Sequence, residues 1–124
     1  MMKVLVVDDN RLLAANIQEV LEDDGLDVMS ANDGVDGYSA YLRFKPDIVI
    51  TDIQMPRKNG LEMMGRIRTH EPKIRTIYMS GDIDPYRPFL TEEKRKYPVS
   101  FFAKPFSLES LRRVVRETTA HSLQ

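Results

Sequence analysis

The chain of 124 residues is long enough for one domain with a single apolar core. Its 42% hydrophobic and 30% charged residues are a globular balance, and the absence of cysteine excludes disulfides and thiolate metal sites. A formal net charge of −1 gives no basic field for nucleic acid or anionic lipid, and the short apolar run at the N-terminus meets acid too soon for a signal peptide or a membrane span.

The first half of the chain alternates short apolar runs with segments of helical period. In chain order it predicts a strand at 3–7, a helix closed by Gly25, a strand at 26–31 and a helix at 35–44. Leu13, Ile17 and Leu21 recur at helical spacing and indicate the first helix. The second helix must end before Lys45-Pro46, because a residue that precedes proline avoids helical geometry.

The second half continues this alternation. It predicts a strand at 47–51 that leads to Asp52, a helix, strands at 76–79 and 100–103, and a last helix from Ser107. The helix after Asp52 is indicated by Leu61, Met64 and Ile67, which share one helical face.

The segment between the last two strands is the least regular part of the sequence. Pro85 and Pro88 cannot lie inside a helix, so the helix here should begin late, near Pro88, and end before Pro98. A long loop then follows Ser80.

Five strands that alternate with five helices predict an α/β fold with a parallel sheet covered on both faces. Right-handed crossovers make it a doubly wound, three-layer sandwich. In such sheets ligands bind at the carboxyl ends of the strands, so residues at those ends are the first candidates for function.

Five polar residues fall at these strand ends. Asp8 and Asp9 follow the first strand, and Asp52, Ser80 and Lys104 end the third, fourth and fifth. Clustered carboxylates repel one another and call for a cation, and Mg²⁺ prefers such oxygen ligands. A nucleophilic carboxylate with a dication, a lysine and a hydroxyl suits in-line phosphoryl transfer. Taken singly, Asp8 and Asp9 could instead cap the next helix and Lys104 could be a surface charge.

Four short motifs give these positions a family context: Val-Val-Asp-Asp at 6–9, Asp-Ile-Gln-Met-Pro-Arg-Lys-Asn-Gly at 52–60, Tyr-Met-Ser-Gly at 78–81 and Phe-Phe-Ala-Lys-Pro-Phe at 101–106. In this the chain resembles the receiver domains of two-component response regulators, over essentially its whole length. The resemblance implies the strand order 2-1-3-4-5. It also implies one receiver domain at 1–124 that catalyses only its own phosphorylation and dephosphorylation.

The resemblance implies a role for each acidic residue. Asp52 would accept a phosphoryl group from the phosphohistidine of a sensor kinase. Asp9, Asp52 and the backbone carbonyl of Gln54 would ligate magnesium directly, while Asp8 would act mainly through water.

The remaining positions would bind, transmit or limit the phosphoryl signal. Ser80 and Lys104 would contact the phosphoryl oxygens, and the Lys104–Pro105 bond would be cis. Phe101 would turn inward when Ser80 moves, although a plain core role for this aromatic is equally open. Gln54 and Asp82 would tune the phosphoryl lifetime, unless Asp82 only caps the next segment.

The partners implied are a cytoplasmic histidine kinase or phosphotransfer protein, and an effector that docks on the fourth helix, fifth strand and fifth helix. The resemblance also allows a phosphorylation-dependent dimer, and implies no direct contact with nucleic acid or membrane. Residues 118–124 are too few for an effector domain. Tyr86, Phe89 and Tyr97 are candidate contacts on an unusual output face, with burial in the core favoured for Phe89.

Two other functions remain open from the sequence. One is a docking module of receiver shape that is never phosphorylated. Loss of Asp8, Asp9, Asp52 or Lys104 would indicate such a module, and all four residues are present. The other is a magnesium-dependent phosphohydrolase. Such enzymes carry an Asp-x-Asp nucleophile motif after the first strand and a cap domain, and this chain has adjacent aspartates there and no room for a cap.

Overall fold

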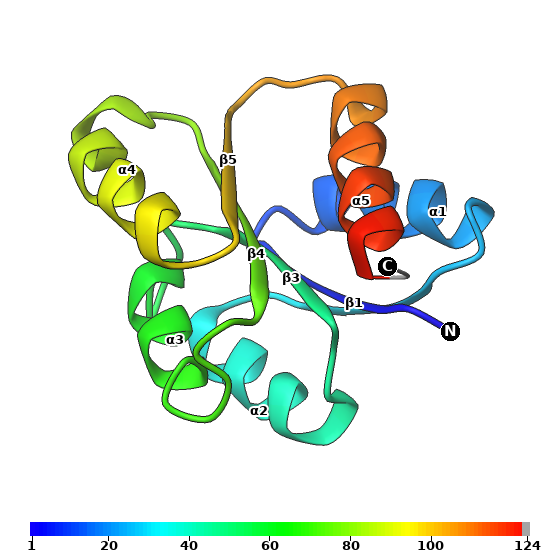
Figure 1. The fold of residues 1–124 in the computed structure, drawn as a ribbon, viewed down its shortest axis with the longest axis horizontal. Coiled ribbons are helices and arrows are strands. Elements are labelled where there is room, and N and C mark those ends of the chain that lie inside the picture. The colour runs from blue at the N-terminus through cyan, green and yellow to red at the C-terminus, as the bar shows by residue number, and fades with distance from the viewer. Residues whose placement is uncertain (123–124) are drawn as a thin grey trace.

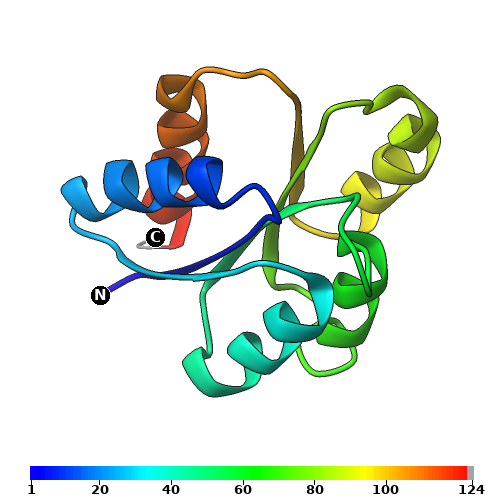
Figure 2. The same cartoon turned by 180° about the vertical axis from the view of Figure 1, so that it is seen from behind.

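The computed structural model describes residues 1–122 and shows a parallel sheet with helices on both faces (Figures 1 and 2). Residues 123 and 124, the end of the 118–124 segment that is too short for an effector domain, lie outside this description. The strands are β1 (Lys3–Val7), β2 (Asp27–Ala31), β3 (Ile48–Asp52), β4 (Arg75–Ser80) and β5 (Val99–Ala103). The helices are α1 (Arg11–Asp23), α2 (Gly34–Phe44), α3 (Gly60–Ile67), α4 (Arg87–Lys96) and α5 (Leu108–Ser122), with a 3₁₀ turn, η1 (Asp84–Tyr86), before α4.

The five strands are ordered β2-β1-β3-β4-β5 and all pairings are parallel. The predicted doubly wound α/β sandwich is therefore confirmed, and every strand boundary agrees with the predicted one to within one residue. In the register, Asp52 lies opposite Met79, and Ser80 lies opposite Ala103. This register brings the carboxyl ends of β3, β4 and β5 side by side at one end of the sheet.

Alternate side chains of the central strands point into two separate cores. Leu5 and Val7 of β1 face a core shared with α2, α3 and α4, whereas Val4 and Val6 face a core shared with α1 and α5. These four side chains are fully buried. A strand buried on both faces reads as a continuous apolar run, which is why this segment could be recognised from its sequence.

Polar side chains fix where the helices begin. Asn10 accepts from the Leu13 N–H at the start of α1, and Ser107 accepts from the Ser110 N–H at the start of α5. At α3, Asn59 and Glu62 form a reciprocal capping box. Each cap satisfies a backbone donor that the first helical turn leaves unpaired. The predicted start of the last helix at Ser107 is confirmed.

The β4–α4 segment follows the proline prediction and adds a short turn. Helix α4 has Pro88 in its first turn and ends before Pro98, while η1 fills the long loop after Ser80. The preferred burial of Phe89 was wrong, since 49% of this residue is exposed. Its neighbour Leu90 is fully buried instead, because adjacent residues of a helix point in different directions and α4 turns Leu90 toward the core.

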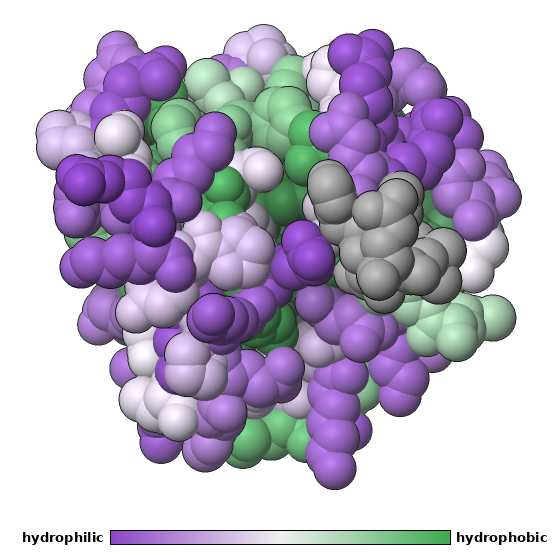
Figure 3. Space-filling view, viewed as in Figure 1, coloured by the Kyte–Doolittle hydropathy of each residue, from purple (hydrophilic) through white to green (hydrophobic). Residues whose placement is uncertain are grey.

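The surface around β5 combines apolar and polar regions. In the view of Figure 3, apolar side chains emerge between the polar surfaces of α4 and α5. Within residues 1–122, no helix combines the length and the apolar character that crossing a membrane requires.

Candidate functional site

Three carboxylates lie together at the carboxyl ends of β1 and β3. Carboxylate oxygens of Asp8, Asp9 and Asp52 lie within 4.8 Å of one another. Asp8 and Asp9 follow β1, and Asp52 ends the neighbouring strand β3. Asp8 is fully buried, Asp52 is 6% exposed and Asp9 is exposed, so the cluster opens to solvent on the side of Asp9.

Lys104, from the far end of the chain, joins this cluster. Its Nζ donates to Asp8 Oδ2 at 2.9 Å and lies 3.5 Å from Asp52 Oδ2. Its backbone N–H donates to the Ser80 carbonyl at 2.7 Å, which ties the β5–α5 loop to the end of β4. The Lys104–Pro105 bond is cis, as predicted. One ammonium therefore faces two of the three carboxylates.

These contacts shift the protonation of the central groups. Burial, followed by the negative charge of Asp8, raises the pKa of Asp52 to about 6, against the opposing effect of Lys104. For Lys104, burial favours the neutral form, but the hydrogen bond to Asp8 and the charge of Asp52 prevail and raise its pKa. Asp52 is thus mostly ionised at neutral pH, yet easily neutralised below it.

Hydrogen bonds hold the side-chain oxygens of two predicted site residues, Asp52 and Ser80. Asp52 Oδ1 accepts from the Ile53 N–H at 3.0 Å, which fixes the carboxylate plane. The Ser80 hydroxyl is fully buried, donates to the Asp82 carbonyl at 3.0 Å and accepts from the Asp82 N–H at 3.1 Å. Ser80 therefore points its hydroxyl at its own loop in this structure.

The loop after Asp52 folds closely against the end of β3. The Gly60 N–H donates to the Ile53 carbonyl at 2.8 Å, and a Cβ on Gly60 would overlap the Asp52 carbonyl oxygen. Arg57, in the left-handed region with φ of 70°, pairs with Asp33 at 2.7 Å at the start of α2. The absence of a side chain at Gly60 is therefore a condition of this loop path.

The other predicted site residues surround this centre. Phe101 of β5 is partly buried, and its ring centroid lies 5.9 Å from the Arg87 guanidinium carbon and from Lys94 Nζ. The side chains of Gln54 and Asp82 are both exposed. Gln54 Nε2 donates to the Tyr86 hydroxyl at 2.9 Å, a contact absent from the sequence-based predictions. No local sequence signal could have found it, because the two residues lie on different loops.

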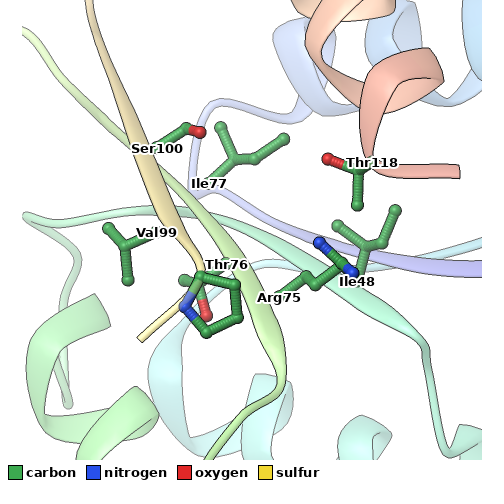
Figure 4. A pocket seen from close by; sticks show the side chains of 8 residues that line it. Ile48, Arg75, Thr76, Ile77, Val99, Ser100 and Thr118 are labelled. Carbon is green, nitrogen blue, oxygen red and sulfur yellow. The ribbon is translucent and has the colours of Figure 1, made fainter. Parts of the chain in front are cut away.

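A cavity of about 140 Å³ lies at the opposite end of the sheet (Figure 4). Ile48, Arg75 and Val99, which begin β3, β4 and β5, line it together with Thr118 of α5. Because Asp8 and Asp9 follow the carboxyl end of β1 and Asp52 ends β3, the acidic cluster lies at the other end of the sheet and this cavity is separate from it.

The residues at the acidic edge fit a magnesium ion. Their donors are hard carboxylate oxygens, close enough to share one ion and open to solvent beside Asp9. Magnesium typically takes one or two carboxylates and keeps several waters, which such a half-open cluster permits.

A comparison with family models matches residues 4–116 to the response regulator receiver domain. Among curated proteins, sporulation initiation phosphotransferase F of Bacillus subtilis is 28% identical over 117 residues, covering 93% of this chain and 91% of that protein. A protein-glutamate methylesterase/protein-glutamine glutaminase of Haloarcula marismortui is 34% identical over 104 residues, covering 83% of this chain but only 28% of that protein. The chain thus spans nearly the whole of one relative and little more than a quarter of the other.

Among solved structures, the response regulator protein TrrA of Thermotoga maritima, in complex with Mg(2+)-BeF, superposes with a TM-score of 0.81. It is 27% identical to this chain, and the match covers 94% of this chain and 98% of that one.

Proposed function

Since the chain belongs to the response regulator receiver domain family, we propose that it is a phosphorylation-controlled switch with Asp52 as its acceptor. The donor would be the phosphohistidine of a sensor kinase or a phosphotransfer protein. The observation that carries this proposal is the cluster of Asp8, Asp9 and Asp52 faced by Lys104 Nζ.

In the transfer, a carboxylate oxygen of Asp52 attacks phosphorus while the phosphorus–nitrogen bond breaks and its electron pair returns to the imidazole. The reaction needs the ionised carboxylate, which predominates at neutral pH because the pKa of Asp52 is about 6. The Ile53 N–H orients this carboxylate, and Lys104 can swing from Asp8 toward the arriving phosphoryl oxygens.

Asp9, Asp52 and the Gln54 carbonyl would hold magnesium directly, and Asp8 would act through water. When bound, the ion supplies positive charge that offsets repulsion between the carboxylates and the incoming phosphoryl group. Asp8 and Lys104 already form a charge pair beside Asp52, so the negative charge of buried Asp8 is offset by a residue of the chain itself.

The switch would begin at Ser80. To bond a phosphoryl oxygen, its hydroxyl must give up the Asp82 carbonyl, which changes the path of the chain just after β4. Phe101 would then turn inward and leave Arg87 and Lys94, changing the surface of α4, β5 and α5. We propose this surface, with exposed Phe89 at its α4 side, as the docking site of the effector.

The test is to incubate the protein with acetyl phosphate and magnesium and to measure its intact mass. We expect a gain of one phosphoryl group in the wild type and in Asp23→Asn, which alters an exposed carboxylate at the end of α1, but none in Asp52→Asn. No gain under any condition would favour the docking module. Turnover of an added phosphoester would favour a phosphohydrolase.

A further inference from the structure

A hydrogen bond joins the two loops that leave β3 and β4. Gln54 Nε2 donates to the Tyr86 hydroxyl at 2.9 Å. Gln54 follows Asp52 by two residues, and Tyr86 follows Ser80 by six. Because β3 and β4 are neighbours in the sheet, this bond connects the loop of the acceptor with the loop of the serine that would bind the phosphoryl group.

The two partners differ in how firmly they are held. Tyr86 belongs to η1, where its N–H donates to the Ile83 carbonyl at 3.0 Å. Its ring is partly buried against the core that contains Ile83 and Leu90. Gln54 is exposed and has a long side chain with several rotamers. Tyr86 is thus the fixed point, and its hydroxyl selects one orientation of the Gln54 side chain.

We propose that Tyr86 is a positioning residue that holds the Gln54 side chain beside the acceptor and thereby prolongs the life of the aspartyl phosphate. The inference rests on the function proposed above. In hydrolysis a water oxygen bonds to phosphorus while the bond from phosphorus to the Asp52 oxygen breaks. The electron pair returns to the carboxylate, and the water proton leaves with inorganic phosphate or passes to solvent.

The direction of the effect follows from where this water must enter. It attacks in line with the leaving Asp52 oxygen, and therefore comes from solvent rather than from the buried side of Asp8. Gln54 and Tyr86 belong to the two loops that border this entrance. Tied together they narrow it, whereas a released Gln54 side chain moves away and opens it.

Asp82 is the alternative position for this role, because the family resemblance pointed to it. Its side chain is exposed, and both its backbone groups bond the Ser80 hydroxyl. The long segment after Ser80 brings Tyr86 of η1 to Gln54 instead. The variant Asp82→Asn tests whether Asp82 or Tyr86 controls hydrolysis. Of these two residues, it is Tyr86 whose side-chain oxygen contacts Gln54.

The experiment follows the loss of the phosphoryl group by intact mass after acetyl phosphate is removed. We expect Tyr86→Phe to hydrolyse about three- to tenfold faster than the wild type, the range that one neutral hydrogen bond corresponds to. Tyr97→Phe, which removes a hydroxyl at the other end of α4, should stay within about twofold, and Asp82→Asn should have a smaller effect than Tyr86→Phe. Unchanged or slower hydrolysis in Tyr86→Phe, or a larger effect of Asp82→Asn, would overturn the assignment.

A second variant shows whether Tyr86 acts through Gln54. Gln54→Ala should accelerate hydrolysis as much as Tyr86→Phe, and the double variant should be no faster than either one. Multiplied effects would overturn the route through Gln54. A wild type that gains no phosphoryl group would instead refute the proposed function, so the two failures are distinct. Unchanged melting temperatures in the variants would exclude general loosening of the fold as the cause. A lower melting temperature of Tyr86→Phe, together with its faster hydrolysis, would count against positioning.

Discussion

Lys104 Nζ donates a 2.9 Å hydrogen bond to Oδ2 of Asp8. The Asp8 side chain has no exposed surface, whereas 22% of the Lys104 side chain is exposed. A buried carboxylate needs a partner charge, and this lysine provides it from the edge of the site. Lys104 therefore stabilises the folded protein in addition to its proposed contact with the phosphoryl group. A dication at the cluster would also compensate part of the negative charge of Asp8.

Lys104→Met should accordingly destabilise the metal-free protein, because it leaves Asp8 buried without its cation. The expected loss is roughly 1–3 kcal/mol, below the value for a fully buried pair, since Lys104 is partly exposed. Magnesium should raise the melting temperature of this variant more than that of the wild type. Thermal unfolding with a chelator and with magnesium measures both effects.

Lys96→Met is a matched control for the lysine variant, because it removes an exposed lysine at the end of α4. It should change neither the stability nor the response to magnesium. An equal rise in melting temperature with magnesium in Lys104→Met and the wild type would contradict the idea that both Lys104 and the dication compensate the charge of Asp8.

The raised pKa of Asp52 predicts how stability depends on pH without metal. The folded carboxyl holds its proton up to a pKa of about 6, whereas the unfolded one loses it near its ordinary pKa of about 4. The folded state thus binds more protons between these values, and stability falls as pH rises through this window.

Asp52→Asn removes this cost of ionisation. In chelator, the variant should equal the wild type near about pH 4 and exceed it by roughly 1–3 kcal/mol above about pH 7. Urea unfolding at several pH values provides the measurement. A stability difference that stays constant across this range would show that burial and the charge of Asp8 do not govern the protonation of Asp52.

Two glycines of α3 should respond to alanine in opposite directions. At Gly65 an added Cβ meets no atom within 4 Å, so Gly65→Ala should stabilise the helix by about 0.5–1 kcal/mol. At Gly60 the Cβ would overlap the Asp52 carbonyl oxygen, so Gly60→Ala should destabilise the protein by roughly 2 kcal/mol or more and slow phosphorylation. Urea midpoints and the mass assay test this pair, and a tolerated alanine at position 60 would contradict the close approach.

Much of the site could be predicted because its residues follow strands that are recognisable locally. The run at 47–51 is nearly all β-branched and therefore predicts a strand that ends at Asp52. In a parallel sheet the carboxyl ends of the strands lie together, so the position of Asp52 beside the other strand ends could be predicted. Pro88 and Pro98 similarly bounded α4, since proline excludes helical interior positions whatever the tertiary structure. These are local constraints that packing does not override.

What could not be predicted depends on contacts between distant segments. The exposure of Phe89 is set by which face of α4 meets the sheet, and residue type alone favoured burial. The bonds from Lys104 to Asp8 and from Gln54 to Tyr86 each connect separate loops. Spacing along the chain indicates which strand end a residue reaches, but not which partner its side chain selects there.

Phe101 offers a direct test of the proposed switch, because the chain contains no tryptophan and Phe101→Trp would be its only such reporter. In the present state the ring is partly buried, with Arg87 and Lys94 each 5.9 Å from its centroid. Acetyl phosphate with magnesium should move it inward, shift its emission to shorter wavelength and reduce quenching by iodide. Phe102→Trp is the matched control, because Phe102 packs in the opposite core beside Phe106. An equal shift at both positions, or a shift that persists when Asp52→Asn is added, would mean that the ring at position 101 does not report the phosphoryl group.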